Sequence, residues 1–404
     1  MSHISQATLR RVYDSRGRPT VQASIWTESG AYATVGAPSG ASTSAHEAQA
    51  FPDGGVLEAV DRFRSLVVPR LIGMAIEDRT GIDQALHQVD GTTNFRRIGG
   101  NVATAVSVGT ALALARERRL EFWEVVRRDG VDGRTFPAIV GNCINGGRHA
   151  IGGPDIQEFH AFSPDPDPAR SIPAALAVHR EVGEALHRKY PQLALGRGDE
   201  GGWVAPVGNI EALEILVEAC HTVRDRLDIA VYPGLDFAAS EFFENGHYRY
   251  REQTFDGEGQ LGFVTSLVDR FDLKYVEDPF DEEAFDLFEE FTRNVGHRTL
   301  VVGDDIYASS TSLLDRGIAG KASNAVLIKV NQVGTLTDAL RTVDRAREAG
   351  WMTVASHRSG DVPDGWLADL AVGCGSAGLK CGLLGGERVA KLNELLRLAA
   401  ATGN

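Results

Sequence analysis

Six ionisable residues in the second part of the chain each follow a short apolar run, at intervals that recur. They are Asp236, Glu277, Asp304, Lys329, His357 and Lys380, separated by 41, 27, 25, 28 and 23 residues. An eight-fold β/α barrel uses about 31 residues for each strand and its helix, and its reactive groups stand at the carboxyl ends of the strands. The spacing therefore predicts a barrel with these six groups gathered at one end.

The first three of these groups are carboxylates that end successive predicted strands. Asp236, Glu277 and Asp304 would repel one another strongly in a low-dielectric pocket unless a cation lay between them. With oxygen donors and no Cys or His nearby, a hard ion such as Mg²⁺ is the natural partner. The alternative is three unrelated acids at the surface or at helix caps, and the regular spacing argues against it.

Lys329 lies in the β-branched segment VLIKVNQVGTLT, residues 326–337. Burial and nearby cations would lower the pKa of its amine, and such a lysine can act as a general base at neutral pH. The alternative is a structural ion pair with one core acid.

Three further polar segments could serve the same site, although none decides anything in isolation. Residues 356–360 (SHRSG) offer a guanidinium, a hydroxyl and backbone donors that suit a phosphate, yet such a segment is more often a surface turn. Residues 198–202 (GDEGG) hold Glu200 in a glycine frame that lets a substrate approach closely. Residues 36–44 (GAPSGASTS) are either a mobile lid or a linker.

The hydrophobic periodicity predicts two domains that would position these groups. Residues 4–50 alternate apolar and polar positions, which predicts two or three antiparallel strands, and residues 101–120 follow a helical period. We therefore expect an α+β domain over residues 1–130 and an α/β barrel over residues 131–404. Helices are expected at 335–349, which stops at a glycine, and at 387–401.

The composition and net charge of the chain exclude some classes of binding partner. The 404 residues carry a net charge of −14 and a pI of about 5.3, which makes nucleic acid an unsuitable ligand. An anionic substrate would need metal ions or a local basic cluster. No stretch resembles a signal peptide or a membrane span, and the four cysteines have no metal-binding spacing, so a reduced cytoplasmic setting is expected. Three G-x-G-x-x-G matches do not open helices after clear strands, so a dinucleotide site is not predicted.

The sequence resembles the enolase (phosphopyruvate hydratase) family nearly from end to end. The segments that carry the resemblance occur in the family's order: VYDSRGRPT (12–20), PSGAST (38–43), NCINGGRHA (142–150), QEF (157–159), GDEGG (198–202), GLDFAASEFF (234–243), VEDPF (276–280), GDDI (303–306), LIKVNQVGTLT (327–337), SHRSG (356–360) and ERVAKLN (387–393). The resemblance implies a small capping domain on a modified barrel whose first strands depart from the regular alternation, and at least a dimer.

The resemblance also implies a reaction and a set of roles. The chain would interconvert 2-phosphoglycerate and phosphoenolpyruvate, with two Mg²⁺ per site. Lys329 would abstract the C2 proton, and Glu200 would protonate the departing C3 hydroxyl. The remaining groups would bind metal (Asp236, Glu277 and Asp304 for the first ion, Ser39 for the second), the phosphate (Arg358 and Ser359), the carboxylate (Lys380), or line the pocket (His149, Gln157, Glu158 and His357).

The sequence departs from the family pattern at a few places. Arg148 precedes the pocket histidine, His160 follows QEF where methionine is usual, and Gly385–Gly386 replaces an Arg-Ser pair. These departures keep open a paralogue of phosphonate metabolism, similar to carboxyphosphonoenolpyruvate synthase, that uses the same proton-abstraction site. A non-catalytic binding protein is a third hypothesis, and the intact set of catalytic groups argues against it.

Overall fold

The N-terminal part of the computed structural model, which describes residues 2–40 and 44–402, is an antiparallel sheet covered by helices. Strands β1 (Ile4–Tyr13), β2 (Pro19–Thr27) and β3 (Tyr32–Gly36) pair in chain order, as predicted. Helices α1 (Gly55–Arg62), α2 (Val68–Leu71), α3 (Arg79–Asp90), α4 (Gly100–Arg118) and α5 (Phe122–Val126) follow. Residues 41–43 of the predicted lid segment lie outside the described residues.

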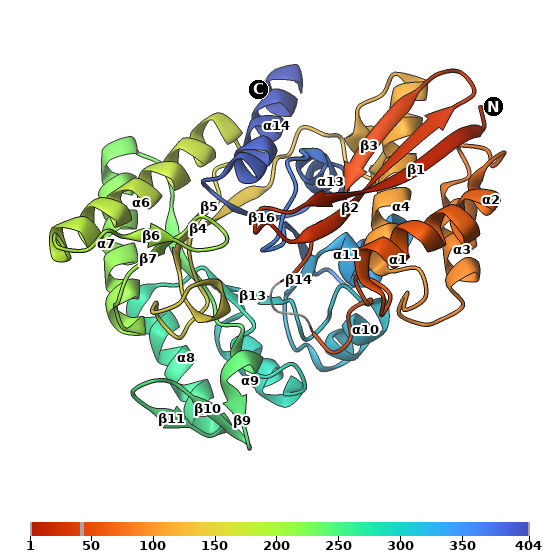
Figure 1. Cartoon of the computed structure of the whole chain (residues 1–404). Coiled ribbons are helices and arrows are strands. Elements are labelled where there is room, and N and C mark those ends of the chain that lie inside the picture. The colour runs from red at the N-terminus through yellow and green to blue at the C-terminus, as the bar shows by residue number, and fades with distance from the viewer. Residues whose placement is uncertain (1, 41–43, 403–404) are drawn as a thin grey trace.

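Helix α4 joins this sheet to the rest of the molecule. Its residues are mostly Ala, Gly, Val, Ser and Thr, and nearly all are buried, so neighbouring elements approach it on every side. It packs against β2 and β3 and also against the short helix α11 (Val330–Val333), which follows Lys329. The N-terminal domain therefore supports the segment that carries Lys329 (Figure 1).

The second part of the chain is a closed barrel. Within the described residues, eight strands form it: β4 (Ala138–Asn145), β5 (Glu158–Ser163), β8 (Tyr232–Asp236), β12 (Tyr275–Glu277), β13 (Leu300–Gly303), β14 (Ala325–Ile328), β15 (Met352–Ser356) and β16 (Gly378–Gly382). Strand β16 pairs with β4 and closes the ring. Six of these strands, β8 and β12 to β16, lie where the apolar runs before the six ionisable residues predicted them. The QEF segment begins a strand, β5, that runs antiparallel to both neighbours.

Helices surround the barrel and small strands extend its mouth. The helices are α6 (Pro168–Lys189), α7 (Asn209–Leu227), α8 (Gly257–Phe271), α9 (Phe285–Val295), α10 (Thr311–Gly320), α12 (Leu336–Glu348), α13 (Trp366–Cys374) and α14 (Gly386–Thr402). The hairpin of β6 (Gly196–Arg197) and β7 (Trp203–Val204) carries the GDEGG segment, and β9 (Phe243–Glu244), β10 (His247–Arg249) and β11 (Thr254–Phe255) form a separate small sheet. No helix in residues 2–40 or 44–402 is long and apolar enough to cross a membrane.

Strand register brings the predicted site residues into line. Asp236 pairs with Glu158 on one side and with Glu277 on the other, so three carboxylates stand in one row across β5, β8 and β12. On the opposite side of the barrel, Ser356 pairs with Lys380. Apolar side chains fill the interior beneath them: Val140, Tyr275, Val302, Ala325, Leu327 and Val354.

A buried histidine fastens the GDEGG segment to helix α6. The Nε2 atom of His179 lies 2.9 Å from the carbonyl oxygen of Gly201, and its ring lies 5.5 Å from the ring of Trp203. Burial lowers the pKa of His179 to about 4. The neutral ring is therefore part of the folded structure.

This histidine should make the fold acid-sensitive. The pKa of His179 is lower in the folded protein than in the unfolded chain, so its contribution to the free energy of unfolding is complete above about pH 6.5. That contribution, at most about 3 kcal/mol, is lost as the pH falls towards 4. Urea unfolding of the wild type and of His179→Gln at several pH values measures this pH dependence. Glutamine offers an amide N–H in place of the ring N–H, and it does not titrate. We expect the free energy of unfolding of the variant to depend less on pH, and parallel pH profiles would contradict the assignment.

Candidate active site

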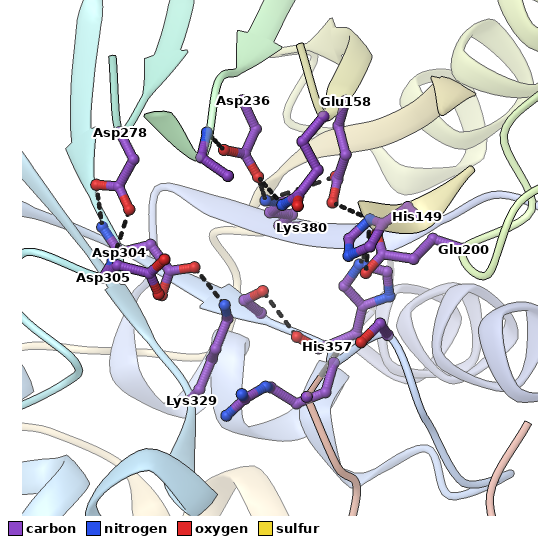
Figure 2. A pocket seen from close by; sticks show the side chains of 16 residues that line it. His149, Glu158, Glu200, Asp236, Asp278, Asp304, Asp305, Lys329, His357 and Lys380 are labelled. Carbon is purple, nitrogen blue, oxygen red and sulfur yellow. Dashed lines mark hydrogen bonds and ion pairs between the residues drawn. The ribbon is translucent and has the colours of Figure 1, made fainter. Parts of the chain in front are cut away.

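A pocket of about 380 Å³ opens at the carboxyl ends of the barrel strands. On one wall, the amine of Lys380 lies 2.7 Å from Asp236 Oδ2 and 2.6 Å from Glu277 Oε1. Figure 2 shows Lys380 beside Asp236 and Glu158. Burial opposes the charge of Lys380, but these carboxylates raise its pKa well above the usual value. Burial, reinforced by Asp236, raises the pKa of Glu277 well above normal.

Lys329 and Asp304 form an ion pair on the adjacent wall (Figure 2). Gln332 supports the pair by donating its Nε2 to Asp304 Oδ1 at 3.0 Å. Burial alone would lower the pKa of Lys329, but the Asp304 carboxylate raises it. The expectation of a lowered lysine pKa is therefore wrong for this arrangement, because the nearest charge is an acid and not a cation.

Two further acids stand beside Asp304. Asp278 accepts the backbone N–H groups of Asp304 and Asp305, at 2.9 and 2.6 Å. Burial, together with the neighbouring carboxylates, raises the pKa of both Asp278 and Asp305 well above normal. One oxygen from each of the three acids lies within 4.8 Å of the others.

A line of alternating histidines and glutamates forms the opposite wall. His357 Nε2 lies 3.0 Å from Glu200 Oε2, and His149 Nδ1 lies 3.8 Å from Glu200 Oε1 and 3.1 Å from Glu158 Oε1. Burial raises the pKa of Glu158 to about 7, with Glu200 adding to the effect. Burial also opposes ionisation of Glu200, but His357, His149 and Arg388 hold its pKa well below normal. The wall therefore contains two carboxyl groups of different acidity.

The SHRSG segment provides the cationic end of the pocket. Arg358 lines the pocket and donates to Glu47 through Nη1 at 2.9 Å and Nη2 at 3.1 Å. Ser359 also lines the pocket, and Gln157 reaches Asp236 Oδ2 at 3.5 Å. A fixed guanidinium of this kind suits an anionic oxygen group such as a phosphate.

Ser39 is positioned differently from the other predicted ligands. Its backbone pairs with Gly360, and its hydroxyl accepts a hydrogen bond from Asn101 Nδ2 at 2.9 Å. Gly40, the next residue, lines the pocket. The metal-binding role of Ser39 stays a prediction.

The departures from the family pattern occupy separate places. Arg148 is largely exposed and pairs with Glu241 beside the pocket's rim. His160 is fully buried in β5. Gly385 has a φ of +116° where the chain turns into α14, a conformation that glycine adopts readily.

Sequence reasoning missed several residues that position the site. Arg388 is wholly buried, and it donates to the carbonyl oxygens of Arg358 and Ser359 at 2.7 and 2.8 Å. The Tyr275 hydroxyl donates to Glu277, and Glu47 holds Arg358. Arg388 had a signal, since it stands in the ERVAKLN segment on the buried side of the last predicted helix. Tyr275 also had one, because it shares a strand face with Glu277.

The donor set fits a hard divalent cation. Six carboxylates line the pocket, against two lysines and one arginine, Lys329, Lys380 and Arg358. Burial raises the pKa of three of these acids, Glu158, Asp278 and Asp305, and within the described chain the buried Gln157 Oε1 has no hydrogen-bond partner. Buried oxygens with excess negative charge are the ligands that Mg²⁺ prefers.

The fold and site together define a barrel enzyme with one reversed strand and an acidic, lysine-containing pocket at its mouth. Residues 4–126 match the family profile described as the enolase N-terminal domain, and residues 134–404 match the enolase C-terminal TIM barrel domain. The chain therefore belongs to the enolase family, and it is a hydro-lyase. The predicted division at residue 130 lies between the two matched segments and stays a prediction.

Curated relatives named enolase match almost the whole chain. The protein of Methanothermobacter thermautotrophicus is 42% identical over 403 residues, which cover 98% of this chain and 96% of that protein. The Natronomonas pharaonis protein is 42% identical over 402 residues, covering 99% and 100%. The Thermoplasma acidophilum protein is 40% identical over 395 residues, covering 98% of each.

Proposed function

We propose that this enzyme interconverts 2-phosphoglycerate and phosphoenolpyruvate with two Mg²⁺ per site. The observation that carries the proposal is that Lys329 and Glu200 enter one acidic pocket from different walls (Figure 2), and that Arg358 and Lys380 line the same pocket. A base and an acid on different sides of a bound substrate are what an anti elimination requires.

Each end of such a substrate has a partner in the pocket. Arg358 and Ser359 would take the phosphate, and Lys380 the carboxylate. Asp236, Glu277 and Asp304 would hold the first ion, and Ser39 would contribute to the second. Bound there, the ions supply positive charge that stabilises the dianionic carboxylate formed when C2 loses its proton.

Two proton transfers complete the reaction. Lys329 Nζ takes the proton as the C2–H bond breaks, and the electron pair passes to the carboxylate. The electron pair held on the carboxylate then forms the C2=C3 double bond while the C3–O bond breaks, and Glu200 delivers a proton to the departing hydroxyl, which leaves as water. Glu200 must take up that proton before this step, because in the free protein its neighbours hold its pKa well below normal. His149, Gln157, Glu158 and His357 border this side and orient the leaving group and Glu200. Lys329 must be neutral to act, which requires that Asp304 no longer serve as its sole counter-ion.

The alternative, a paralogue of phosphonate metabolism, is not favoured. The relatives that match nearly the full chain bear the name enolase. Arg148 pairs with Glu241, and neither residue belongs to the pocket lining. The homo-oligomer and the cytoplasmic location stay predictions.

Steady-state formation of phosphoenolpyruvate from 2-phosphoglycerate tests the proposal. We expect turnover with Mg²⁺, complete loss after chelation, and recovery when Mg²⁺ is restored, because the carbanion has no sufficient counter-charge otherwise. Calorimetric titration of the chelated protein with Mg²⁺ gives a second readout, and Glu277→Gln should weaken that binding. Metal-saturated protein that leaves 2-phosphoglycerate unchanged would contradict the proposal.

A further inference from the structure

A second row of side chains lies directly beneath the carboxylate row. Strand register pairs Gly234 of β8 with His160 of β5 on one side and with Tyr275 of β12 on the other. A Cβ atom at Gly234 would lie 2.9 Å from the Tyr275 Cβ, so glycine leaves the space above β8 open. The two rings meet across that space edge to face, with centroids 5.7 Å apart and an interplanar angle of 85°. His160 is thus fixed in place by packing.

The polar atoms of His160 lack the partners that a buried imidazole normally has. The residue is fully buried, and neither ring nitrogen has a hydrogen-bond partner with good geometry among the residues that the structure describes. Its Nε2 lies 3.3 Å from Glu158 Oε2, which also lacks a hydrogen bond. A buried donor and a buried acceptor that both lack partners are unfavourable, so these two neighbouring atoms are suited to pair with each other.

The protonation of His160 fits this pairing. Burial lowers its pKa well below the usual value, so the ring is neutral and carries one N–H. The orientation towards Glu158 selects the Nε2–H tautomer, which donates to a carboxylate oxygen.

Glu158 then has a histidine beside each of its two oxygens. His149 Nδ1 lies 3.1 Å from Oε1, on the pocket side, and His160 Nε2 lies 3.3 Å from Oε2, on the barrel side. The Lys380 amine is a competitor for Oε2, at 3.5 Å. The methionine that is usual in the family offers Oε2 no donor. In this chain, His160 therefore adds a contact that keeps the carboxylate from turning towards Lys380 and away from His149.

We propose that His160 is a positioning residue that acts through Glu158 to align His149 and Glu200 for loss of the C3 hydroxyl. The inference rests on the proposed function. It assigns His160 to one chemical step only: Lys329 is held by Asp304 on β13–β14, away from β5, so abstraction of the C2 proton does not depend on this contact.

The test separates the two steps in the Mg²⁺-loaded enzyme. Exchange of the C2 hydrogen of 2-phosphoglycerate with deuterium from D₂O reports proton abstraction, and phosphoenolpyruvate absorbance reports water loss. For His160→Met, which brings back the residue usual in the family and fills the space without a donor, we expect water loss to fall by about 3–10-fold, the effect of one hydrogen bond. Exchange should stay within about twofold of the wild type. His160→Gln, whose side-chain amide can donate to Glu158, should recover most of the loss.

Controls make the outcome decisive. Tyr275→Phe disturbs the same row and removes the hydroxyl from Glu277, not from Glu158. If His160 had only a packing role, His160→Met and Tyr275→Phe would show the same pattern, with exchange and water loss falling together. That result would overturn the proposal. Unchanged rates in His160→Met would also overturn it. If His160→Met does not fold, His160→Gln and His160→Asn are compared instead, because the shorter asparagine side chain does not reach Glu158. Wild-type protein that performs neither step would instead refute the proposed function.

Discussion

Lys329→Ala is expected to lower turnover of 2-phosphoglycerate by about 10⁴-fold. Among the residues that the structure describes, the Lys329 amine is the only cationic group that forms an ion pair with Asp304. C2 hydrogen exchange should vanish together with phosphoenolpyruvate formation, because both begin with the same proton transfer. Both rates are measured on one sample in D₂O.

Two matched variants isolate the chemistry from the charge. Lys329→Arg preserves a cation beside Asp304 but cannot lose its proton near neutral pH, so it should be as inactive as the alanine variant. Lys189→Ala removes an exposed lysine at the end of α6 and should leave both rates unchanged. Persisting exchange in Lys329→Ala would show that another group is the base.

The barrel could be predicted from the sequence because its strands repeat a simple physical pattern. Each of the runs that end in Asp236, Glu277 or Lys380 is a buried apolar segment closed by a charged group, and parallel strands gather such groups at one edge. Strand β5 escaped this reasoning. It reads Glu-Phe-His-Ala-Phe-Ser, with polar groups facing the barrel interior and its charged residue at its start, because it runs in the opposite direction.

The limits of prediction at the site have a different cause. A sequence pattern locates a residue on a strand but does not say which charge is its nearest neighbour across the barrel. Lys329 was expected among cations, and the nearest group is Asp304, which reverses the direction of its pKa shift. Likewise, the contact between His160 and Tyr275 follows from their common neighbour Gly234, which only the strand register reveals.

Glu200→Gln should give the complementary result to the lysine variants. Glutamine keeps the shape of Glu200 and its contacts with His357 and Asn142, but it has no proton to give to the leaving hydroxyl. We expect phosphoenolpyruvate formation to fall by about 10³-fold while C2 hydrogen exchange continues. The same D₂O experiment measures both rates. Loss of exchange in Glu200→Gln would mean that this residue also supports proton abstraction, and the division of labour between the walls would be wrong.

The reverse reaction tests the role of Glu200 from the other side. Because its neighbours hold the pKa of Glu200 well below normal, it is ionised in the free protein, the state suited to taking a proton from water during hydration of phosphoenolpyruvate. Glu200→Gln should therefore lose hydration as severely as dehydration. A double variant that combines Glu200→Gln with His160→Met tests whether His160 acts only through Glu200. If His160 acts only by aligning the Glu158–His149–Glu200 line, the double variant should lose much less than the product of the single losses, because the aligned group is already absent.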